Sequence, residues 1–271
     1  MITSPQNPRI KEAVRLRDGR QRRKAGRFLI DGGREILRAF RAGIAPRELF
    51  VCEELCRTPE SRTLLEFAGE LTANGCELLP VSATIFAKLA YGDREDGVVA
   101  VVESRAESLR DLTSLKLPET PLVAVAAGVE KPGNLGAIAR SADGAGVSAL
   151  LAAGVGADLE NPHAIRASLG TIFGLPCRAT DEPAALAWLR ERRLTIYAAM
   201  LDPAAVDYTQ VDFRGPTAIV LGGEADGLGE LWRVADVHPI RLPMLGAADS
   251  LNVSTAAAVL FYEALRQRTV R

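Results

Sequence analysis

Apolar residues along this chain occur either in short continuous runs or at helical spacing, and this alternation predicts an α/β protein. Runs such as 98–102, 122–127 and 217–221 consist of β-prone or small apolar residues, as expected of buried strands. Between the runs, apolar positions such as Ile36 and Phe40 fall on one helical face. Strands that are followed by helices on short connections predict a mostly parallel sheet, with its ligands at the carboxyl ends of the strands.

The periodicity is lost once, in the stretch ESLRDLTSLKLPETP, which is charged and contains two prolines. A composition of this kind predicts a linker. We therefore expect a smaller domain over residues 1–105, a linker over 106–118 and a larger domain over 119–271. A length of 271 residues is compatible with two domains.

The last predicted helix combines an apolar stripe with a polar entrance. Val253, Ala257, Leu260 and Ala264 share one face, so the helix must be packed. The polar residues at its entrance are Asp249, Ser250, Asn252, Ser254 and Thr255. An N-cap explains one such residue but not all of them. The stretch is therefore a candidate site on a rigid base.

Two further polar stretches follow predicted strands. In EKPGNLGAIARSADGAG, Gly133 and Gly136 are expected to permit a tight turn, beside the amide of Asn134 and the cation of Arg140. This loop could hold a phosphate or a ribose, or it could be an ordinary capped helix with a solvated arginine.

The other stretch is IVLGGEADGLGELW, a β-run that ends in glycines around Glu224 and Asp226. A phosphate-binding loop would need Lys or Arg and free N–H groups. The carboxylates therefore favour a nucleoside-type ligand.

The formal net charge is −1, but cations are concentrated near the N-terminus. They are Arg9, Lys11, Arg15, Arg17, Arg20, Arg22, Arg23, Lys24 and Arg27. Only Glu12 and Asp18 oppose them in this segment. Such density is typical of an arm that contacts RNA phosphates, although a solvated helix face is the commoner explanation of a charge run.

Composition excludes several other classes. Four cysteines without a CxxC pair and two isolated histidines give no zinc or disulfide framework, so we expect no metal, and Cys52 and Cys56 are predicted to be packing residues. GAGVSA follows a helix rather than a strand, which argues against a Rossmann site, and no Ser/His/Asp arrangement indicates a hydrolase. Neither a membrane-spanning run nor a secretory segment is recognisable, which predicts a cytoplasmic protein with no membrane partner.

Taken together, three segments resemble the motifs of the SpoU/TrmH branch of the SPOUT RNA methyltransferases. They are NLGAIARSADGAG, IVLGGEADGLG and LPMLGAADSLNVSTAAAVLFYEALRQR, of which the third matches nearly residue for residue. More loosely, SPQNPRIK, FLIDGGREIL and the strand 97–102 are similar to the ribosomal-protein-like α/β/α domain of rRNA-modifying members. The resemblance implies a C-terminal SPOUT catalytic domain with a parallel sheet and a trefoil knot, a preceding RNA-substrate-binding domain, and a homodimer.

The resemblance also implies roles for individual residues. Asn134 and Arg140 are expected at the reacting ribose, together with Glu224, Ser250 and Asn252. The residues expected around S-adenosylmethionine are Gly222, Gly223, Leu242, Met244, Leu251 and Ser254. Because an arginine is a poor base, we expect Arg140 to orient phosphate and ribose and to stabilise developing negative charge.

The activity implied by this resemblance is S-adenosylmethionine-dependent 2′-O-methylation of structured RNA. The two-part organisation and the basic segment favour rRNA over tRNA. A tRNA methyltransferase and a non-catalytic RNA-binding assembly factor with the same fold are the alternatives. The assembly factor is disfavoured because the motif residues Asn134, Arg140, Glu224, Ser250 and Asn252 are all present.

Overall fold

The computed structural model describes residues 1–90, 96–154, 156–223 and 227–269, and the chain divides into two compact units. The first unit contains Met1–Ala106 and Glu160–Gly174, and the second contains Glu107–Leu159 and Leu175–Arg271. The segment Glu160–Gly174, which the sequence places in the C-terminal domain, thus belongs with the first unit. The RNA-binding and catalytic roles of the two parts stay predictions.

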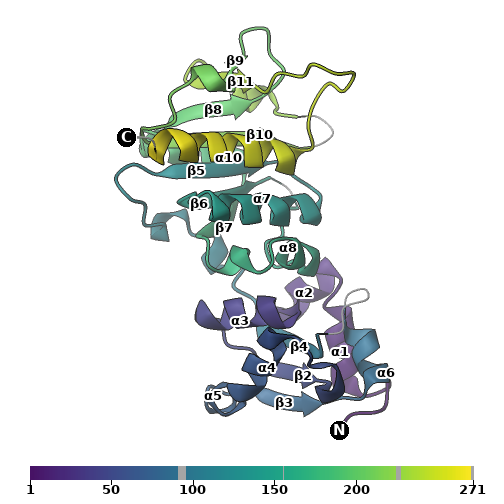
Figure 1. The fold of residues 1–271 in the computed structure, drawn as a ribbon. Helices are drawn as coiled ribbons and strands as arrows, with labels where there is room; N and C mark the ends of the chain where they lie inside the picture. The colour runs from purple at the N-terminus through teal and green to yellow at the C-terminus, as the bar shows by residue number, and fades with distance from the viewer. Residues whose placement is uncertain (91–95, 155, 224–226, 270–271) are drawn as a thin grey trace. The chain divides into compact units, whose positions relative to one another are not determined.

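The first unit is built on a mixed sheet with the strand order β1-β4-β2-β3 (Figure 1). Its strands are β1 (Arg27–Asp31), β2 (Glu48–Val51), β3 (Glu77–Pro80) and β4 (Val98–Glu103). Strand β4 is antiparallel to both neighbours, whereas β2 and β3 are parallel. Its helices are α1 (Pro8–Arg15), α2 (Gly19–Ala25), α3 (Gly33–Arg41), α4 (Pro59–Glu66), α5 (Ala68–Ala73) and α6 (Ala83–Leu89), with the 3-10 turn η1 (Glu53–Leu55).

A segment from later in the chain completes this first unit. It contains α8 (Pro162–Ala167) and the 3-10 turn η4 (Thr171–Phe173). The rings of Phe28 and Phe173 stack with centroids 6.4 Å apart, and Ser104 Oγ donates to Glu160 Oε2 at 2.5 Å. A deletion of residues 1–105 would therefore expose the buried Phe173 and remove the partner of Glu160.

The second unit is an α/β layer with a seven-stranded sheet in the order β7-β6-β5-β10-β8-β11-β9 (Figure 1). All of its strand pairs are parallel, which confirms the predicted α/β class and parallel sheet. The strands are β5 (Leu122–Ala127), β6 (Ala149–Ala153), β7 (Cys177–Thr180), β8 (Thr195–Ala199), β9 (Val206–Asp207), β10 (Thr217–Gly222) and β11 (Val237–Arg241). The trefoil knot stays a prediction.

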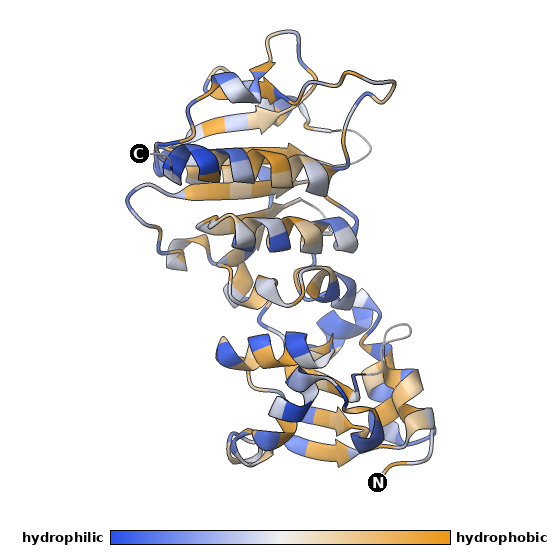
Figure 2. Ribbon diagram, in the orientation of Figure 1, coloured by the Kyte–Doolittle hydropathy of each residue, from blue (hydrophilic) through white to orange (hydrophobic). Residues whose placement is uncertain are grey.

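Apolar composition explains why β5 and β6 lie inside the sheet. Every residue of both strands is buried, as expected for strands covered on both faces. Figure 2 shows the corresponding hydrophobic colouring of the strands. The helices of this unit are α7 (Pro132–Gly144), α9 (Glu182–Glu191) and α10 (Val253–Thr269), with the 3-10 turns η2 (Ser108–Arg110), η3 (Leu112–Ser114), η5 (Tyr208–Gln210) and η6 (Glu230–Trp232).

The stretch predicted as a linker, 106–118, packs mostly against the second unit. Leu109 and Leu115 are buried, and Arg178 donates to the carbonyl oxygen of Asp111 at 2.9 Å. Loss of helical periodicity here therefore reflects two short 3-10 turns, whose few residues cannot produce a periodic signal.

All four cysteines are free and buried, in agreement with the packing role predicted for Cys52 and Cys56. Burial raises the pKa of the Cys56 and Cys76 thiols to about 11. These side chains are therefore protonated at neutral pH and poorly reactive. Among the described helices, none combines the length and apolarity that a membrane span requires.

The C-terminal end of α10 is fixed by one arginine. Arg268 donates to the carbonyl oxygens of Phe213, Thr120 and Gly215 at 2.8, 2.8 and 2.6 Å, and to that of Pro121 at 3.2 Å. Burial lowers the pKa of its guanidinium, which remains charged. This side chain holds the segments before β5 and β10 against the last helix.

We expect Arg268→Ala to lower the free energy of unfolding by about 2–4 kcal/mol, because several charge-assisted hydrogen bonds are lost and carbonyl groups are left without a donor. Urea unfolding followed by circular dichroism measures the change. The matched control is Arg266→Ala on the same helix. The Arg266 side chain is 62% exposed and, among the residues that the structure describes, pairs with Glu263 alone. Equal destabilisation by both variants would contradict the anchoring role of Arg268.

Candidate functional site

A cavity of about 560 Å³ opens at the carboxyl ends of β8, β10 and β11. This position is the one the sequence predicts for a ligand in a parallel sheet. Its residues are Lys131, Ala199, Met200, Leu201, Leu221, Gly222, Gly223, Gly227, Leu228, Arg233, Ile240, Arg241, Leu242, Met244, Asp249, Ser250, Leu251, Asn252, Val253 and Ala256. The volume lies within the roughly 300–1,000 Å³ typical of small-ligand sites.

Bare backbone forms one wall of this cavity, where β10 ends. A β-carbon on Gly222 would lie 2.5 Å from the carbonyl carbon of Gly227, and one on Gly223 would overlap the carbonyl oxygen of Gly128. Gly223 and Gly227 also form an isolated antiparallel bridge. Only glycine therefore allows the end of β10 to approach the end of β5 so closely. The result is a polar backbone surface directly beside the cavity.

The opposite wall is the polar entrance of α10. Asn252 is the N-cap of this helix, because its Oδ1 accepts from the backbone N–H of Ser254 at 2.9 Å and from Ser254 Oγ at 2.7 Å. Its Nδ2 donates to Asn134 Oδ1 on α7 at 3.3 Å. The cap explanation is thus correct for Asn252 but incomplete, since the same amide also joins two of the sequence motifs.

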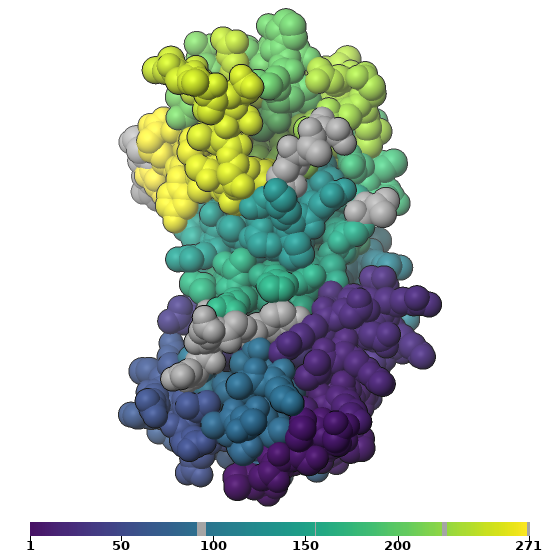
Figure 3. All heavy atoms as spheres, turned by 90° about the vertical axis from the view of Figure 1, so that its right-hand side faces the viewer, coloured from purple at the N-terminus to yellow at the C-terminus, as the bar shows by residue number. Residues whose placement is uncertain are grey.

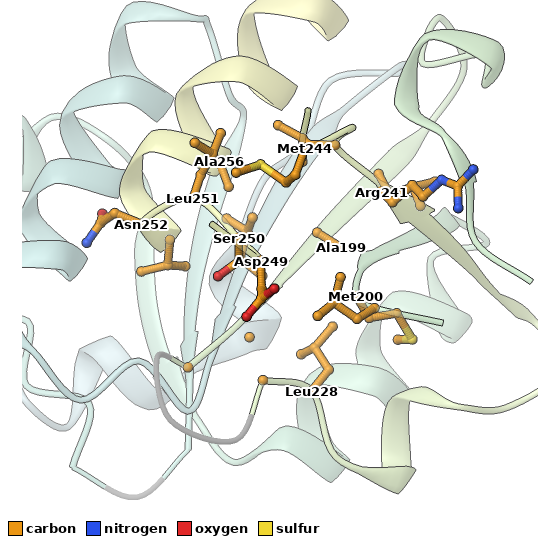
Figure 4. Close-up of a pocket in the computed structure, with 18 of the residues that line it drawn as sticks. Ala199, Met200, Leu228, Arg241, Met244, Asp249, Ser250, Leu251, Asn252 and Ala256 are labelled. Carbon is orange, nitrogen blue, oxygen red and sulfur yellow. The ribbon is translucent and has the colours of Figure 1, made fainter. Parts of the chain in front are cut away.

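Side-chain directions separate two parts of this wall. Asp249 and Ser250 point into the space between Met244 and Leu228, whereas the Asn252 amide extends to the other side, away from them (Figure 4). The wall therefore presents an acidic and a hydroxyl group to the cavity and an amide to the α7 side.

Most residues predicted around the cofactor line this cavity. They are Gly222, Gly223, Leu242, Met244 and Leu251, joined by the predicted catalytic residues Ser250 and Asn252. Ser254 does not line it, and instead its hydroxyl donates to Asn252. Glu224, predicted at the reacting ribose, lies outside the described residues.

The first motif differs from its prediction in local structure. The expected tight turn at Gly133 and Gly136 is wrong, because α7 already begins at Pro132 and both glycines are helical. Proline at the first helical position presets the required φ and starts the helix early. Asn134 lies in the first turn of the helix and reaches Asn252, as described above.

Arg140 is exposed on α7, and within the described part of the chain its side chain makes no hydrogen bond or ion pair. No hydrogen bond among the described residues therefore joins its side chain to Asn134 or Ser250. An exposed guanidinium beside this motif is free to meet a ligand phosphate, the role that the sequence suggests for it.

Sequence reasoning missed several residues of the cavity. Met200 and Leu201 follow β8, and Leu201 is 72% exposed at the rim. Their only signal was their place at the carboxyl end of a predicted strand. Lys131 and Arg233 also line the cavity, and Arg233 pairs with Asp202 at 2.6 Å.

The walls suit a ligand with an apolar ring system and a polar chain. Leu242, Met244 and Leu251 provide apolar surface, and the glycine backbone with Ser250 provides hydrogen-bonding groups. A cavity that combines apolar surface with polar groups that fix the ligand's orientation is typical of cofactor sites. The residues present therefore fit an adenosine-containing ligand with an amino-acid chain.

Comparison with known proteins gives two family matches. Residues 121–262 match the SpoU rRNA Methylase family, and residues 7–100 match the MRM3-like substrate binding domain. The first match covers the cavity, the first two motifs and the third motif as far as residue 262.

Similar proteins extend over nearly the whole chain. A 23S rRNA (uridine(2479)-2′-O)-methyltransferase of Streptomyces viridochromogenes is 33% identical over 98% of this chain and 92% of its own length. The crystal structure of an RNA 2′-O ribose methyltransferase has a TM-score of 0.84 and 41% identity, covering 99% of both chains. An AdoMet-bound rRNA methyltransferase from Sinorhizobium meliloti has a TM-score of 0.85 and 28% identity, covering 98% of this chain and 97% of its own.

Proposed function

The chain belongs to the SpoU rRNA methylase family, and we propose that it transfers a methyl group from S-adenosylmethionine to a ribose 2′-hydroxyl of structured RNA, with rRNA as its substrate. The observation that carries this function is the cavity at the carboxyl edge of the sheet, which gathers residues of the second and third motifs and contacts the first through Asn252 and Asn134. Relatives named for 23S rRNA favour rRNA over tRNA.

The cavity residues bind and orient the cofactor. Leu242, Met244 and Leu251 would enclose the adenosine, while the glycine backbone at Gly222 and Gly223 would hold the methionine end. When bound, S-adenosylmethionine supplies an electrophilic methyl group. In-line displacement needs fixed positions of the reacting atoms, which rigid strand ends and a packed helix provide.

The amide pair of Asn134 and Asn252 is suited to orient the ribose. Their hydrogen bond fixes both side chains, and the Ser254 hydroxyl fixes the other side of Asn252. Arg140, exposed on the same helix as Asn134, would bind substrate phosphate and stabilise the charge that develops on the 2′-oxygen. The role of Glu224 in this arrangement stays a prediction.

Methyl transfer to purified RNA tests this function. A 2′-O-methyl group removes the nucleophile of alkaline cleavage, so the product resists hydrolysis at one linkage. We expect labelled methyl from S-adenosylmethionine in alkali-resistant dinucleotides of rRNA and not of tRNA. RNA binding without methyl transfer would support the assembly factor instead, and methylation of tRNA alone would support the tRNA enzyme.

Substrate RNA would be held by the first unit. Four cations of the basic segment have partners within the fold. Arg9 forms an ion pair with Glu77, and Arg27 forms one with Glu12. Arg17 donates to the carbonyl oxygens of Lys88 and Ala90, and the buried Arg22 donates to those of Leu16 and Arg17. The exposed remainder is Lys11, Arg15, Arg20, Arg23 and Lys24. Figure 2 shows the resulting hydrophilic α2, and Figure 3 shows the N-terminal residues on the surface in purple.

We expect the double change Arg20→Ala and Arg23→Ala to weaken binding of deproteinised large-subunit rRNA. The logarithm of the affinity falls linearly with the logarithm of the salt concentration, and each lost phosphate contact makes this slope less steep by about 0.7–0.9. Filter binding at several salt concentrations measures both quantities. The matched control removes the exposed Arg41 and Arg62 from α3 and α4 of the same unit. If both pairs weaken binding equally, the effect is one of net charge and the assignment to α2 is wrong.

These point variants test RNA binding by the first unit more specifically than a deletion of residues 1–105 does. The deletion also strips Phe173 and Glu160 of the partners that they have in the first unit. A loss of activity in the truncated chain would therefore mix misfolding with lost RNA binding.

We also propose a homodimer in the cytoplasm. Apolar side chains on and beside α10 are partly exposed, with Leu251 at 39% and Tyr262 at 51%. Such a surface is suited to a second copy of the chain. Sedimentation that finds only monomers at micromolar concentration would contradict the dimer, and cell fractionation that recovers the protein with membranes or outside the cell would contradict the location.

A further inference from the structure

The chain contains two tryptophans, and one of them links the cofactor cavity to a carboxylate distant in sequence. Trp232, at the end of η6, is fully buried, and its Nε1 donates to Glu182 Oε2 at 2.7 Å. A buried indole N–H requires an acceptor, and a carboxylate makes the stronger, charge-assisted bond. This bond joins the start of α9 to the segment after β10.

Trp232 stands directly beside residues of the cavity wall. Leu228 lies four residues before it and Arg233 directly follows it, and both line the cavity. Leu228 and Trp232 belong to the same buried cluster, and Arg233 pairs with Asp202. The position of the indole therefore fixes where Leu228 and Arg233 meet the cavity.

Glu182 has a defined position at the capped start of α9, close to the ends of two strands of the sheet. It is the first residue of α9, whose N-cap Asp181 accepts from the N–H of Ala184 at 2.7 Å. Its Oε1 lies 3.6 Å from the place that a β-carbon on Gly154 would occupy and 3.9 Å from that on Gly128. These glycines follow β6 and β5, and Gly128 in turn contacts Gly223.

We propose that Glu182 is a positioning residue for the cofactor cavity. Its carboxylate holds Trp232, and through Trp232 it fixes the wall formed by Gly227, Leu228 and Arg233. The identity of the ligand rests on the proposed function. The alternative is that the bond only satisfies a buried N–H and stabilises the start of α9.

The second tryptophan provides a matched control. Trp188, on the same helix as Glu182, donates its Nε1 to the carbonyl oxygen of Leu112 at 3.2 Å and does not line the cavity. Trp188→Phe and Trp232→Phe each remove one indole N–H and retain an aromatic ring. Only the second variant disturbs the proposed anchor.

Isothermal calorimetry with S-adenosylmethionine and thermal unfolding test the proposal on the full-length protein. We expect Trp232→Phe and Glu182→Ala to raise the dissociation constant about tenfold, which corresponds to about 1.4 kcal/mol and is within the range for a bond to a charged group. Glu182→Gln retains an acceptor and is expected to stay within about threefold of the unmodified protein. Trp188→Phe is expected to lower the unfolding temperature without changing the affinity.

Two results would overturn the positioning role. One is unchanged affinity in Trp232→Phe together with a loss of stability like that of Trp188→Phe. The other is a Glu182→Gln variant that binds as weakly as Glu182→Ala, because the hydrogen bond would then not be the link. Failure of the unmodified protein to bind S-adenosylmethionine would instead contradict the proposed function, and the inference would fall with it.

Discussion

Gly223→Ala is expected to abolish S-adenosylmethionine binding. The added β-carbon would overlap the carbonyl oxygen of Gly128, which is backbone and cannot move aside as a flexible side chain can. Relief of this overlap requires the end of β10, which lines the cavity, to move away from Gly128 at the end of β5. We expect the dissociation constant to rise more than about a hundredfold, as a loss of about 3 kcal/mol would give. Calorimetry measures the affinity, and circular dichroism confirms that the variant is folded.

The control for this change is Gly229→Ala in the same segment. Gly229 has φ −72° and ψ 179°, a conformation open to any residue, and a β-carbon there would meet nothing within 4 Å. We expect its affinity to equal that of the unmodified protein. A folded Gly223→Ala variant that binds S-adenosylmethionine within a few-fold of normal would show that the cofactor does not use this wall.

Asn252→Asp separates the two roles of Asn252. Aspartate retains an oxygen for the N–H of Ser254 and remains a good N-cap, so stability is expected to change little. It removes the N–H that is donated to Asn134 and places negative charge against an oxygen of that amide. We expect methyl transfer to fall about 10–100-fold because a group that orients the ribose is misplaced.

The measurement is single-turnover methyl transfer beside a urea unfolding curve. Asn252→Ala serves as the comparison, since it loses both the cap and the amide donor and is expected to be less stable as well. If Asn252→Asp retains full methyl transfer, Asn252 is only a helix cap. If it loses stability as Asn252→Ala does, the two roles are not separable in this way.

The sequence was sufficient for the second unit's sheet and for much of its cavity. Continuous apolar runs predicted β5 and β10 as buried parallel strands, and the carboxyl-end rule placed the glycine-rich stretch after β10 at a ligand site. The individual residues Gly222 and Leu242 were expected there from the motif resemblance. Patterning succeeds here because β5 is buried along its whole length and β10 as far as Leu221, and the segments that follow them meet at one edge of the sheet. The motif resemblance then separated the polar entrance of α10 from an ordinary cap.

Other features depend on contacts between residues far apart in sequence. Glu182 and Trp232 meet only because α9 and η6 pack together, and no local pattern marks either residue. The segment Glu160–Gly174 belongs to the first unit through contacts such as Phe28 with Phe173, which periodicity cannot report. Pro132 is itself a local signal for the start of a helix, because proline is favoured at the first helical position as well as in turns.

The central claim is that this chain methylates a ribose of rRNA, and mapping of 2′-O-methyl groups in cells tests it most directly. Alkali-resistant linkages are mapped in rRNA and tRNA from cells without the gene and from cells supplied with the unmodified, Gly229→Ala or Gly223→Ala protein. We predict that one rRNA linkage loses its resistance without the gene and regains it with the first two proteins but not with Gly223→Ala. An unchanged rRNA map, whether or not tRNA changes, would contradict the claim.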